Sequence, residues 1–190
     1  MSHAPRDWNA ILNEHAAVVV QLAAAADVLE RIVTTLIECF RGGNRLFILG
    51  NGGSAADAQH IAGELLGRFR LERKTLPAMA LTTDTSTLTA IGNDLGFELV
   101  FARQIEGLVR AGDVVWILST SGNSPNVLAA ARAAAEQGAR VVGFTGRTGG
   151  KLAELCTLAF KTPHDSSDRI QEAHALAYHF VCERVEAALA

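Results

Sequence analysis

Cysteine and positive charge are both scarce in this sequence, and each shortage argues against a class of protein. The 190 residues include three cysteines, an odd number with no CxxC pair, which argues against a disulfide framework and for reduced thiols. Lysine and arginine number 17 against 20 acidic residues, for a net charge of -3. This balance provides no basic surface for nucleic acid or an anionic membrane, so an anionic ligand must be held by local groups.

Long apolar runs are also missing. No stretch reaches the roughly 20 apolar residues that span a bilayer, and the N-terminal MSHAPRDWN lacks the basic and then apolar pattern of a signal peptide. The sequence therefore predicts a cytoplasmic protein with no membrane partner. Its length and its 49% of hydrophobic residues are typical of one compact domain.

Short apolar strands alternate with helical segments in most of the chain. Strands are expected at 45–50, 77–83, 113–120, 140–146 and 156–163. Helices are expected at 54–69, 97–109, 125–138 and about 169–189. Because the strands are apolar throughout, this alternation predicts an α/β fold, a doubly wound parallel sheet of five strands with helices on both faces.

The segment before the first strand lies outside this alternation. From Trp8 to Phe40, apolar residues recur at helical spacing, which predicts one long helix or two consecutive helices with a break near Asp27. The apolar positions extend around more than one helix face. A partner subunit would cover the surplus, so residues 7–41 are expected to mediate oligomerisation.

Two loops rich in glycine and hydroxyl groups follow predicted strands. They are GNGGS at 50–54 and STSGNS at 119–124, and open parallel sheets bind ligands beyond such strand ends. In the second loop Ser124 stands where it would cap a helix that begins with proline, so the free backbone N–H groups of a helix start lie beside the loop. The loop adds four hydroxyls, from Ser119, Thr120, Ser121 and Ser124, that can bind the same anion. An ordinary capped turn explains only Ser124, so we favour phosphate. For the first loop, a capping box of Ser54 with Asp57 is an equally good explanation.

Nucleotide-binding patterns are absent from both loops. Neither has the GxGxxG pattern of dinucleotide sites or the GxxxxGK[ST] pattern of Walker sites. A simple phosphomonoester is therefore the better ligand.

Side chains suited to metal binding or acid-base chemistry follow the first loop. His60 and Glu64 are four residues apart on a predicted helix and share one face. Such a pair binds one metal ion, supplies a base and its orienting partner, or forms an exposed ion pair.

The C-terminal helix carries a second set of polar residues. Asp168 with Gln171 fits a capping box, and the position of His174 fits a side chain that faces solvent. His179 fits a core histidine and a catalytic histidine equally well.

Three segments together are the most specific part of the sequence. They are GNGGSAADAQH at 50–60, STSGNS at 119–124 and DRIQEAHALAYH at 168–179. In this order they resemble the SIS sugar-phosphate-binding fold, and more closely its phosphoheptose isomerase branch. The similarity covers nearly the whole chain, so residues 1–190 are expected to form a single SIS domain.

This resemblance implies a metal site, usually with one zinc ion per subunit, whose ligands are His60, Glu64, Gln171 and His179. It implies substrate contacts from Asn51, Gly52, Gly53, Glu64, Asn93, Asp94, Ser119, Thr120, Ser121, Ser124 and Gln171. It also implies a homotetramer that converts sedoheptulose 7-phosphate to D-glycero-D-manno-heptose 7-phosphate, the first step of bacterial heptose nucleotide synthesis.

A ketose-aldose isomerisation moves a proton between neighbouring carbons through an enediol, so it needs a base, an acid and a group that stabilises the oxyanion. We assign proton transfer to Glu64 and His179, and polarisation of the substrate oxygens to the metal. The alternative is a non-catalytic SIS protein that binds a sugar phosphate or a replication initiator. Such a protein has no reason to keep the four implied ligands together.

The spacing of two implied ligands predicts how the site is assembled. Gln171 and His179 are eight residues apart, about 12 Å along a continuous helix, too far to share one ion comfortably. Either Gln171 lies on an unwound first turn, or His60 and Glu64 meet His179 across a subunit interface. The second arrangement predicts an active site shared between subunits.

Overall fold

The structure is a computed structural model that describes residues 6–190; the first five residues, part of the stretch predicted to lack a signal peptide, lie outside the described residues. Its strands are β1 Leu46–Gly50, β2 Ala78–Ala80, β3 Val114–Ser119, β4 Arg140–Thr145 and β5 Leu158–Lys161. Its α-helices are α1 Trp8–Gln21, α2 Ala26–Arg41, α3 Gly53–Leu66, α4 Thr85–Asp94, α5 Ala102–Leu108, α6 Pro125–Glu136, α7 Leu152–Leu155 and α8 Ser167–Leu189. Two 3-10 helices are η1 Leu22–Ala25 and η2 Phe97–Leu99.

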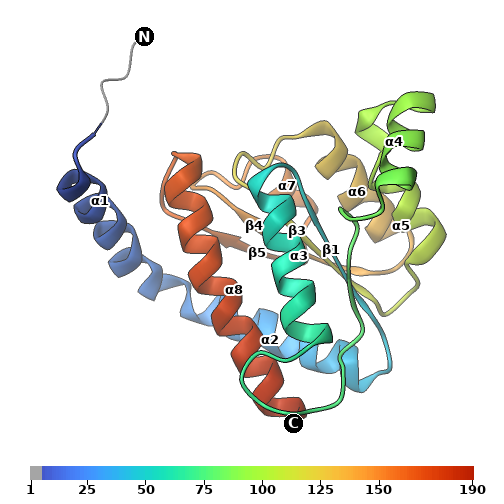
Figure 1. The fold of residues 1–190 in the computed structure, drawn as a ribbon, viewed down its shortest axis with the longest axis horizontal. Helices are drawn as coiled ribbons and strands as arrows, with labels where there is room; N and C mark the ends of the chain where they lie inside the picture. The colour runs from blue at the N-terminus through green and yellow to red at the C-terminus, as the bar shows by residue number, and fades with distance from the viewer. Residues whose placement is uncertain (1–5) are drawn as a thin grey trace.

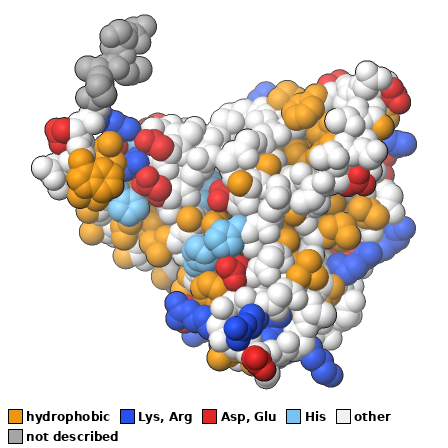
Figure 2. Space-filling view, in the orientation of Figure 1, with side chains coloured by type: hydrophobic (Ala, Val, Ile, Leu, Met, Phe, Trp, Pro, Cys, Tyr) orange, Lys and Arg blue, Asp and Glu red, His pale blue; other side chains and the backbone are white. Residues whose placement is uncertain are grey.

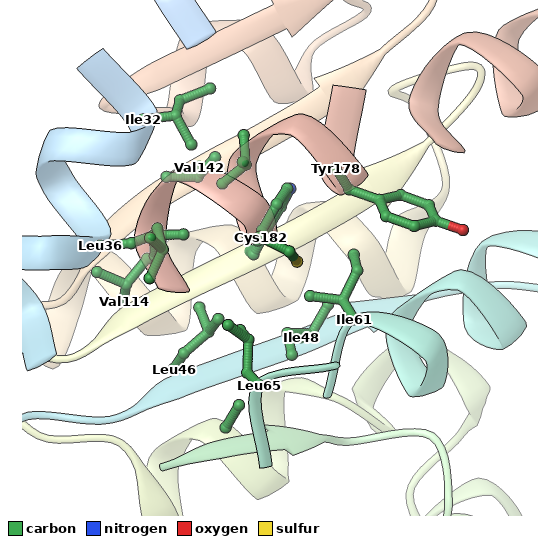
Figure 3. Packing of buried hydrophobic residues seen from close by; sticks show 14 of the residues in the cluster. Ile32, Leu36, Leu46, Ile48, Ile61, Leu65, Val114, Val142, Tyr178 and Cys182 are labelled. Atoms are coloured by element: carbon green, nitrogen blue, oxygen red, sulfur yellow. The ribbon is translucent and has the colours of Figure 1, made fainter. Parts of the chain in front are cut away.

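All five strands form one parallel sheet in the order β2-β1-β3-β4-β5, which confirms the predicted fold class. Alternate residues of β1 enter two apolar cores. Leu46 and Ile48 pack with α2, α3 and α8, whereas Phe47 and Leu49 pack with α5, α6 and α7. Figure 1 shows α3 and α8 side by side over one face of the sheet, and Figure 3 shows side chains of β1, α3 and α8 meeting in the first core.

The strand order reverses direction at β1. The chain passes from β1 through α3 to β2 on one side, whereas β3, with β4 and β5 beyond it, lies on the other side. The ends of β1 and β3 are in register, with Gly50 opposite Leu118. The loops that follow these strands therefore emerge together at a topological switch point, where sheets of this kind bind ligands.

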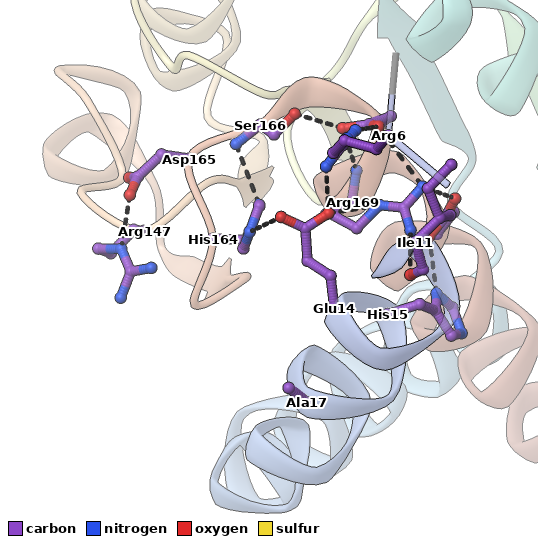
Figure 4. A network of polar contacts seen from close by, with 12 residues as sticks. Arg6, Ile11, Glu14, His15, Ala17, Arg147, His164, Asp165, Ser166 and Arg169 are labelled. Atoms are coloured by element: carbon purple, nitrogen blue, oxygen red, sulfur yellow. Dashed lines mark hydrogen bonds and ion pairs between the residues drawn. The ribbon is translucent and has the colours of Figure 1, made fainter. Parts of the chain in front are cut away.

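The N-terminal segment forms two helices, and the break between them is η1, slightly earlier than the predicted break near Asp27. A polar network joins α1 to the start of α8 (Figure 4), in which Glu14 pairs with Arg6 and His164. The buried Arg169 donates from Nη1 to the carbonyl oxygen of Ile11 at 3.1 Å. On the outer side of α1, large apolar side chains remain exposed, namely Trp8, Leu12 and Val20.

Two helices, α4 and the one-turn α7, were not predicted, and one was predicted too long. Residues 85–94 form α4, whose sequence TSTLTAIGND has a weak apolar pattern; its signal is Asp84, which caps the helix by accepting the N–H of Thr87 at 3.0 Å. The predicted helix at 97–109 divides into η2 and the shorter α5. No helix within residues 6–190 is long and apolar enough to cross a membrane.

Two of the alternatives that the sequence left open for single side chains do not hold in the structure. His174 does not face solvent: it is fully buried against the sheet, and its Nε2 lies 3.2 Å from the carbonyl oxygen of Thr145. Ser54 does not cap its helix with Asp57, because α3 begins one residue earlier, at Gly53. Ser54 is instead buried at the base of the loop.

Candidate functional site

A pocket of about 270 Å³ opens between the two loops at the switch point. Its lining residues are Asn51, Gly52, Gly53, Ser54, Leu118, Ser119, Thr120, Ser121, Ser124, Ser167 and Gln171. Eight of them were predicted substrate contacts, whereas Ser54, Leu118 and Ser167 were not. Ser167 Oγ lies 3.3 Å from Thr120 Oγ1, and its only signal in the sequence was the pair of serines before the last helix. The structure therefore gathers side-chain hydroxyls around one small volume.

The second loop presents a helix start to this pocket. As predicted, Ser124 is the N-cap residue of α6 and proline follows it, yet its side chain makes no capping hydrogen bond within residues 6–190. Its hydroxyl is therefore available to a ligand. Ser119 is buried and its Oγ accepts the N–H of Gly122 at 3.2 Å, which stabilises the turn. Gly122 has a φ of 63° and packs closely against the carbonyl oxygen of Gly149, so only glycine fits there.

The first loop is held against the second by paired amides. Asn51 donates to Asn126 Oδ1 at 2.9 Å, and Asn126 donates back to Asn51 Oδ1 at 2.8 Å. Gly52 has a φ of 56°, a conformation that favours glycine. A Cβ on Gly53 would lie 2.6 Å from Gln171 Nε2, so the absence of a side chain allows that amide to approach the loop.

A second group of polar side chains lies farther along α3 and α8. His60 Nε2 is 3.0 Å from Glu64 Oε1 and 3.4 Å from His179 Nε2. Candidate ligand atoms of these three residues all lie within 4.8 Å of one another. Figure 2 shows the histidines at the surface where α3 and α8 meet, with acidic and basic side chains close by. Two imidazole nitrogens and one carboxylate oxygen are a suitable donor set for zinc.

Neither arrangement predicted from helix spacing is the one that the structure shows. His60 and His179 meet within one chain, so no subunit interface is needed to bring them together. Nor is the start of α8 unwound at Gln171, because the helix begins at Ser167. Gln171 instead lies at the pocket, and its role as a metal ligand stays a prediction.

Three predicted substrate contacts do not line the pocket, namely Glu64, which belongs to the group of His60 and His179, and Asn93 and Asp94. Asn93 and Asp94 lie exposed at the end of α4, where Asn93 Nδ2 donates to Asp94 Oδ1 at 2.7 Å. Neither residue is among those that line the pocket between the loops. Their role in binding substrate also stays a prediction.

Two partly or fully buried groups lie behind His60 and were not predicted. Tyr178 is 2% exposed, and its hydroxyl oxygen lies 3.3 Å from His60 Nδ1 and 3.5 Å from Asp57 Oδ1. Burial, followed by the charge on Asp57, raises the pKa of Tyr178 far above its usual value, so the phenol stays protonated. Burial also raises the pKa of Asp57, against the lowering effects of the Tyr178 hydrogen bond and of both histidines.

Known proteins with similar sequences and structures agree on one family. A family model for the SIS domain matches residues 12–146. A phosphoheptose isomerase from Pelobacter propionicus is 56% identical over 154 residues, 81% of this chain and 82% of that protein. A phosphoheptose isomerase from Bradyrhizobium sp. is 54% identical over 176 residues, 93% of this chain and 87% of that protein. The solved structure of a phosphoheptose isomerase from Neisseria gonorrhoeae is 40% identical, with a TM-score of 0.90 and coverage of 94% of this chain and 96% of that one. The chain therefore belongs to the SIS-domain family and, within it, to the phosphoheptose isomerases, which are enzymes.

Proposed function

We propose that this enzyme converts sedoheptulose 7-phosphate to D-glycero-D-manno-heptose 7-phosphate through an enediol, as the first step of heptose nucleotide synthesis. The observation that carries this proposal is the separation of the pocket from the acid-base group. Gly53 and His60 are seven residues apart on α3, about 10 Å along the helix. A seven-carbon sugar with C–C bonds of about 1.5 Å extends a similar length, about 10 Å, from its phosphate to C1. A phosphate held in the pocket therefore allows C1 and C2 to reach His60, Glu64 and His179.

The phosphate end of the substrate is assigned to the pocket between the loops. Backbone N–H groups at the start of α6 and the hydroxyls of Ser119, Thr120, Ser121 and Ser124 provide an anion site without lysine or arginine. Asn51, Gly52, Gly53 and Gln171 complete this binding set. We retain Asn93 and Asp94 as proposed contacts to the sugar.

Proton transfer is assigned to Glu64 and His179. Glu64 is largely sheltered, with 18% of its side chain exposed, which suits a carboxylate that removes a proton from carbon. His179 approaches the same volume from α8 and is placed to exchange a proton with the neighbouring oxygen. A zinc ion held by His60, Glu64 and His179, with Gln171 as the proposed fourth ligand, would polarise the substrate oxygens. Because a lone pair that binds zinc cannot take up a proton at the same time, the ligand and proton-transfer roles would alternate during turnover.

A sugar-phosphate binder without activity, or a protein that binds a replication initiator, would need only the pocket. The group of His60, Glu64 and His179 argues against this alternative, because these side chains converge about 10 Å along α3 from the pocket, too far to contact a phosphate bound there. The named function of the relatives points in the same direction.

Self-association is proposed for the N-terminal helices. Trp8, Leu12 and Val20 of α1 are 68%, 44% and 75% exposed, and Trp8 and Leu12 lie one turn apart on the same side of the helix. We propose that residues 7–41 contact other copies in a homotetramer, with residues 1–190 as a single domain in each. We also propose a cytoplasmic location, because the three cysteines are free thiols.

The test is a direct assay of purified protein with sedoheptulose 7-phosphate and detection of aldoheptose phosphate. Treatment with a chelator should abolish the activity, and zinc should restore it. His60→Ala should stay inactive with zinc, whereas Gln59→Ala, an exposed neighbour on α3, should retain activity. Full activity in rigorously metal-free protein would contradict the metal assignment, and the absence of product from zinc-loaded protein would contradict the proposed reaction.

A further inference from the structure

Tyr178 lies beside both histidines of the candidate metal group, whose own ring centroids are 5.0 Å apart. Its ring centroid lies 5.5 Å from that of His60 and 4.6 Å from that of His179. The ring belongs to the apolar core beneath α8, yet Figure 3 shows its hydroxyl leaving that core. A phenylalanine would fill the same apolar space, so the hydroxyl needs another explanation.

That hydroxyl faces a carboxylate and an imidazole from one helix. Asp57 and His60 are three residues apart on α3, and both direct polar atoms at the Tyr178 oxygen, at 3.5 and 3.3 Å. The second carboxylate oxygen of Asp57 is buried and has no hydrogen-bond partner within residues 6–190. A carboxylate in this position gains little from core packing. Its Oδ1 accepts a hydrogen bond from the Tyr178 hydroxyl, so this contact is what explains a carboxylate here.

The directions of these contacts determine one another. A phenol has a single hydrogen, and a carboxylate can only accept, so Tyr178 donates to Asp57. The phenol oxygen then accepts from His60, which places the hydrogen of that imidazole on Nδ1. His60 Nε2 is left as an unprotonated nitrogen, and it is the atom that faces Glu64 and His179.

We propose that Asp57 and Tyr178 are positioning residues that hold His60 in the tautomer and orientation required to bind a metal ion through Nε2. This inference rests on the proposed function, because it concerns the same metal group. Histidine ligands commonly donate their second nitrogen to a carboxylate or carbonyl group, and losing such a partner weakens metal binding about 10- to 100-fold. Here the phenol transmits the effect of the carboxylate to the imidazole.

The experiment measures zinc affinity of metal-free protein by competition with a chelating indicator. Tyr178→Phe keeps the ring and removes only the hydroxyl, and it should raise the zinc dissociation constant about 10-fold. Asp57→Asn should have an effect of similar size. Both residues act on His60 through one chain of contacts. The double variant should therefore have about the same zinc dissociation constant as the single variant with the lower zinc affinity.

Thr162→Val is the matched control, because it removes a hydroxyl that is fully buried and without a partner among the described residues, outside the metal group. It should leave zinc affinity unchanged. Circular dichroism and melting of the metal-free proteins show whether each variant folds, and Asp57→Asn provides a second test if Tyr178→Phe does not.

The outcomes separate this inference from the proposed function. If the unaltered protein fails to bind zinc, the proposed metal site is wrong and the inference is wrong with it. If the unaltered protein binds zinc and the folded Tyr178→Phe and Asp57→Asn variants bind it equally well, only the positioning role is overturned. Additive losses in the double variant would also overturn it, because they would show two independent effects.

Discussion

The Nε2 atom of His60 lies 3.4 Å from the Nε2 atom of His179, although 119 residues separate the two histidines along the chain. They meet because α3 and α8 lie side by side, with Gly53 near Gln171 toward the start of both helices and the histidines near the middle of each. At this distance one imidazole N–H can donate to the other nitrogen, and two unprotonated nitrogens can share a cation. The relationship supports the metal site and leads to the first prediction.

A mixture of His60→Ala and His179→Ala subunits should remain as inactive as either variant alone. Each chain in such a mixture lacks one of the imidazoles, and the partner histidine that it needs belongs to the same chain. The measurement is isomerase activity after subunit exchange, with exchange verified by mass spectrometry of isotopically labelled subunits. Recovered activity in verified mixed oligomers would show that these histidines act across an interface after all.

The contact between His60 and His179 marks the limit of what the sequence predicted about the site. The position of each loop could be predicted, because parallel strands such as β1 and β3 end at the same edge of the sheet. The pairing of His60 with His179 within one chain could not, since the spacing of Gln171 and His179 along one helix contains no information about the neighbouring helix. Only the packing of α3 on α8 decides that His179, and not Gln171, lies beside His60.

The same limit applies to the fold. Five strands were recognisable because each is a short apolar run, but α4 was missed because threonine, serine and asparagine dominate its residues. His174 stands between two alanines, Ala173 and Ala175, and its burial depends on which face of α8 meets the sheet. Tertiary contacts, rather than local propensity, determine both features.

Ser124→Ala should raise the Michaelis constant for the sugar phosphate about 10- to 100-fold, since a hydrogen bond to a charged group contributes about 1.5–3 kcal/mol. The melting temperature should change little, because the Ser124 hydroxyl makes no capping bond within the described residues. Ser86→Ala, an exposed serine in the first turn of α4, is the control and should alter neither property. An unchanged Michaelis constant in folded Ser124→Ala would exclude this hydroxyl from the phosphate site.

Gly53→Ala and Gly63→Ala each add a methyl group to α3. The first should lower catalytic efficiency, and the second should raise stability. At Gly53 the new Cβ would lie 2.6 Å from Gln171 Nε2 and would displace that amide from the pocket, so the catalytic efficiency should fall at least several-fold. At Gly63 the Cβ has no atom within 4 Å. Alanine there should stabilise the helix by about 0.5–1 kcal/mol and raise the melting temperature by about 2 °C or slightly more.

Kinetic assays and thermal melts of both glycine variants check this pair. If Gly53→Ala retains the full efficiency of the unaltered enzyme, the close approach of Gln171 to the first loop has no role in binding. If Gly63→Ala destabilises the fold instead, the position is not the open helix surface that the structure shows.

Acid should weaken the fold in two steps, and the first step belongs to His174. Burial lowers the pKa of His174 from 6.5 to about 4, although its hydrogen bond to Thr145 acts in the opposite direction. Between these two values the unfolded chain takes up a proton that the folded chain does not bind. The free energy of unfolding should therefore fall as the pH decreases from 6.5 to 4, by up to about 1.4 kcal/mol per pH unit for this one group.

The second step lies below this window, where Asp168 and Glu186 take up protons. Hydrogen bonding to Ser166 lowers the pKa of Asp168 to about 2, and three backbone N–H groups and Arg73 lower that of Glu186 despite its burial. The stability that these carboxylates contribute is present above their unfolded pKa values and is lost as the pH falls through their folded pKa values.

Urea unfolding at a series of pH values from 7.5 to 3 distinguishes the two steps. His174→Gln should remove the pH dependence of the free energy of unfolding between pH 6.5 and 4 and retain the loss of stability below pH 4. This holds whatever the variant's stability at neutral pH, since the amide does not titrate. An unchanged slope between pH 6.5 and 4 in His174→Gln would show that a group other than this buried imidazole controls the acid limb.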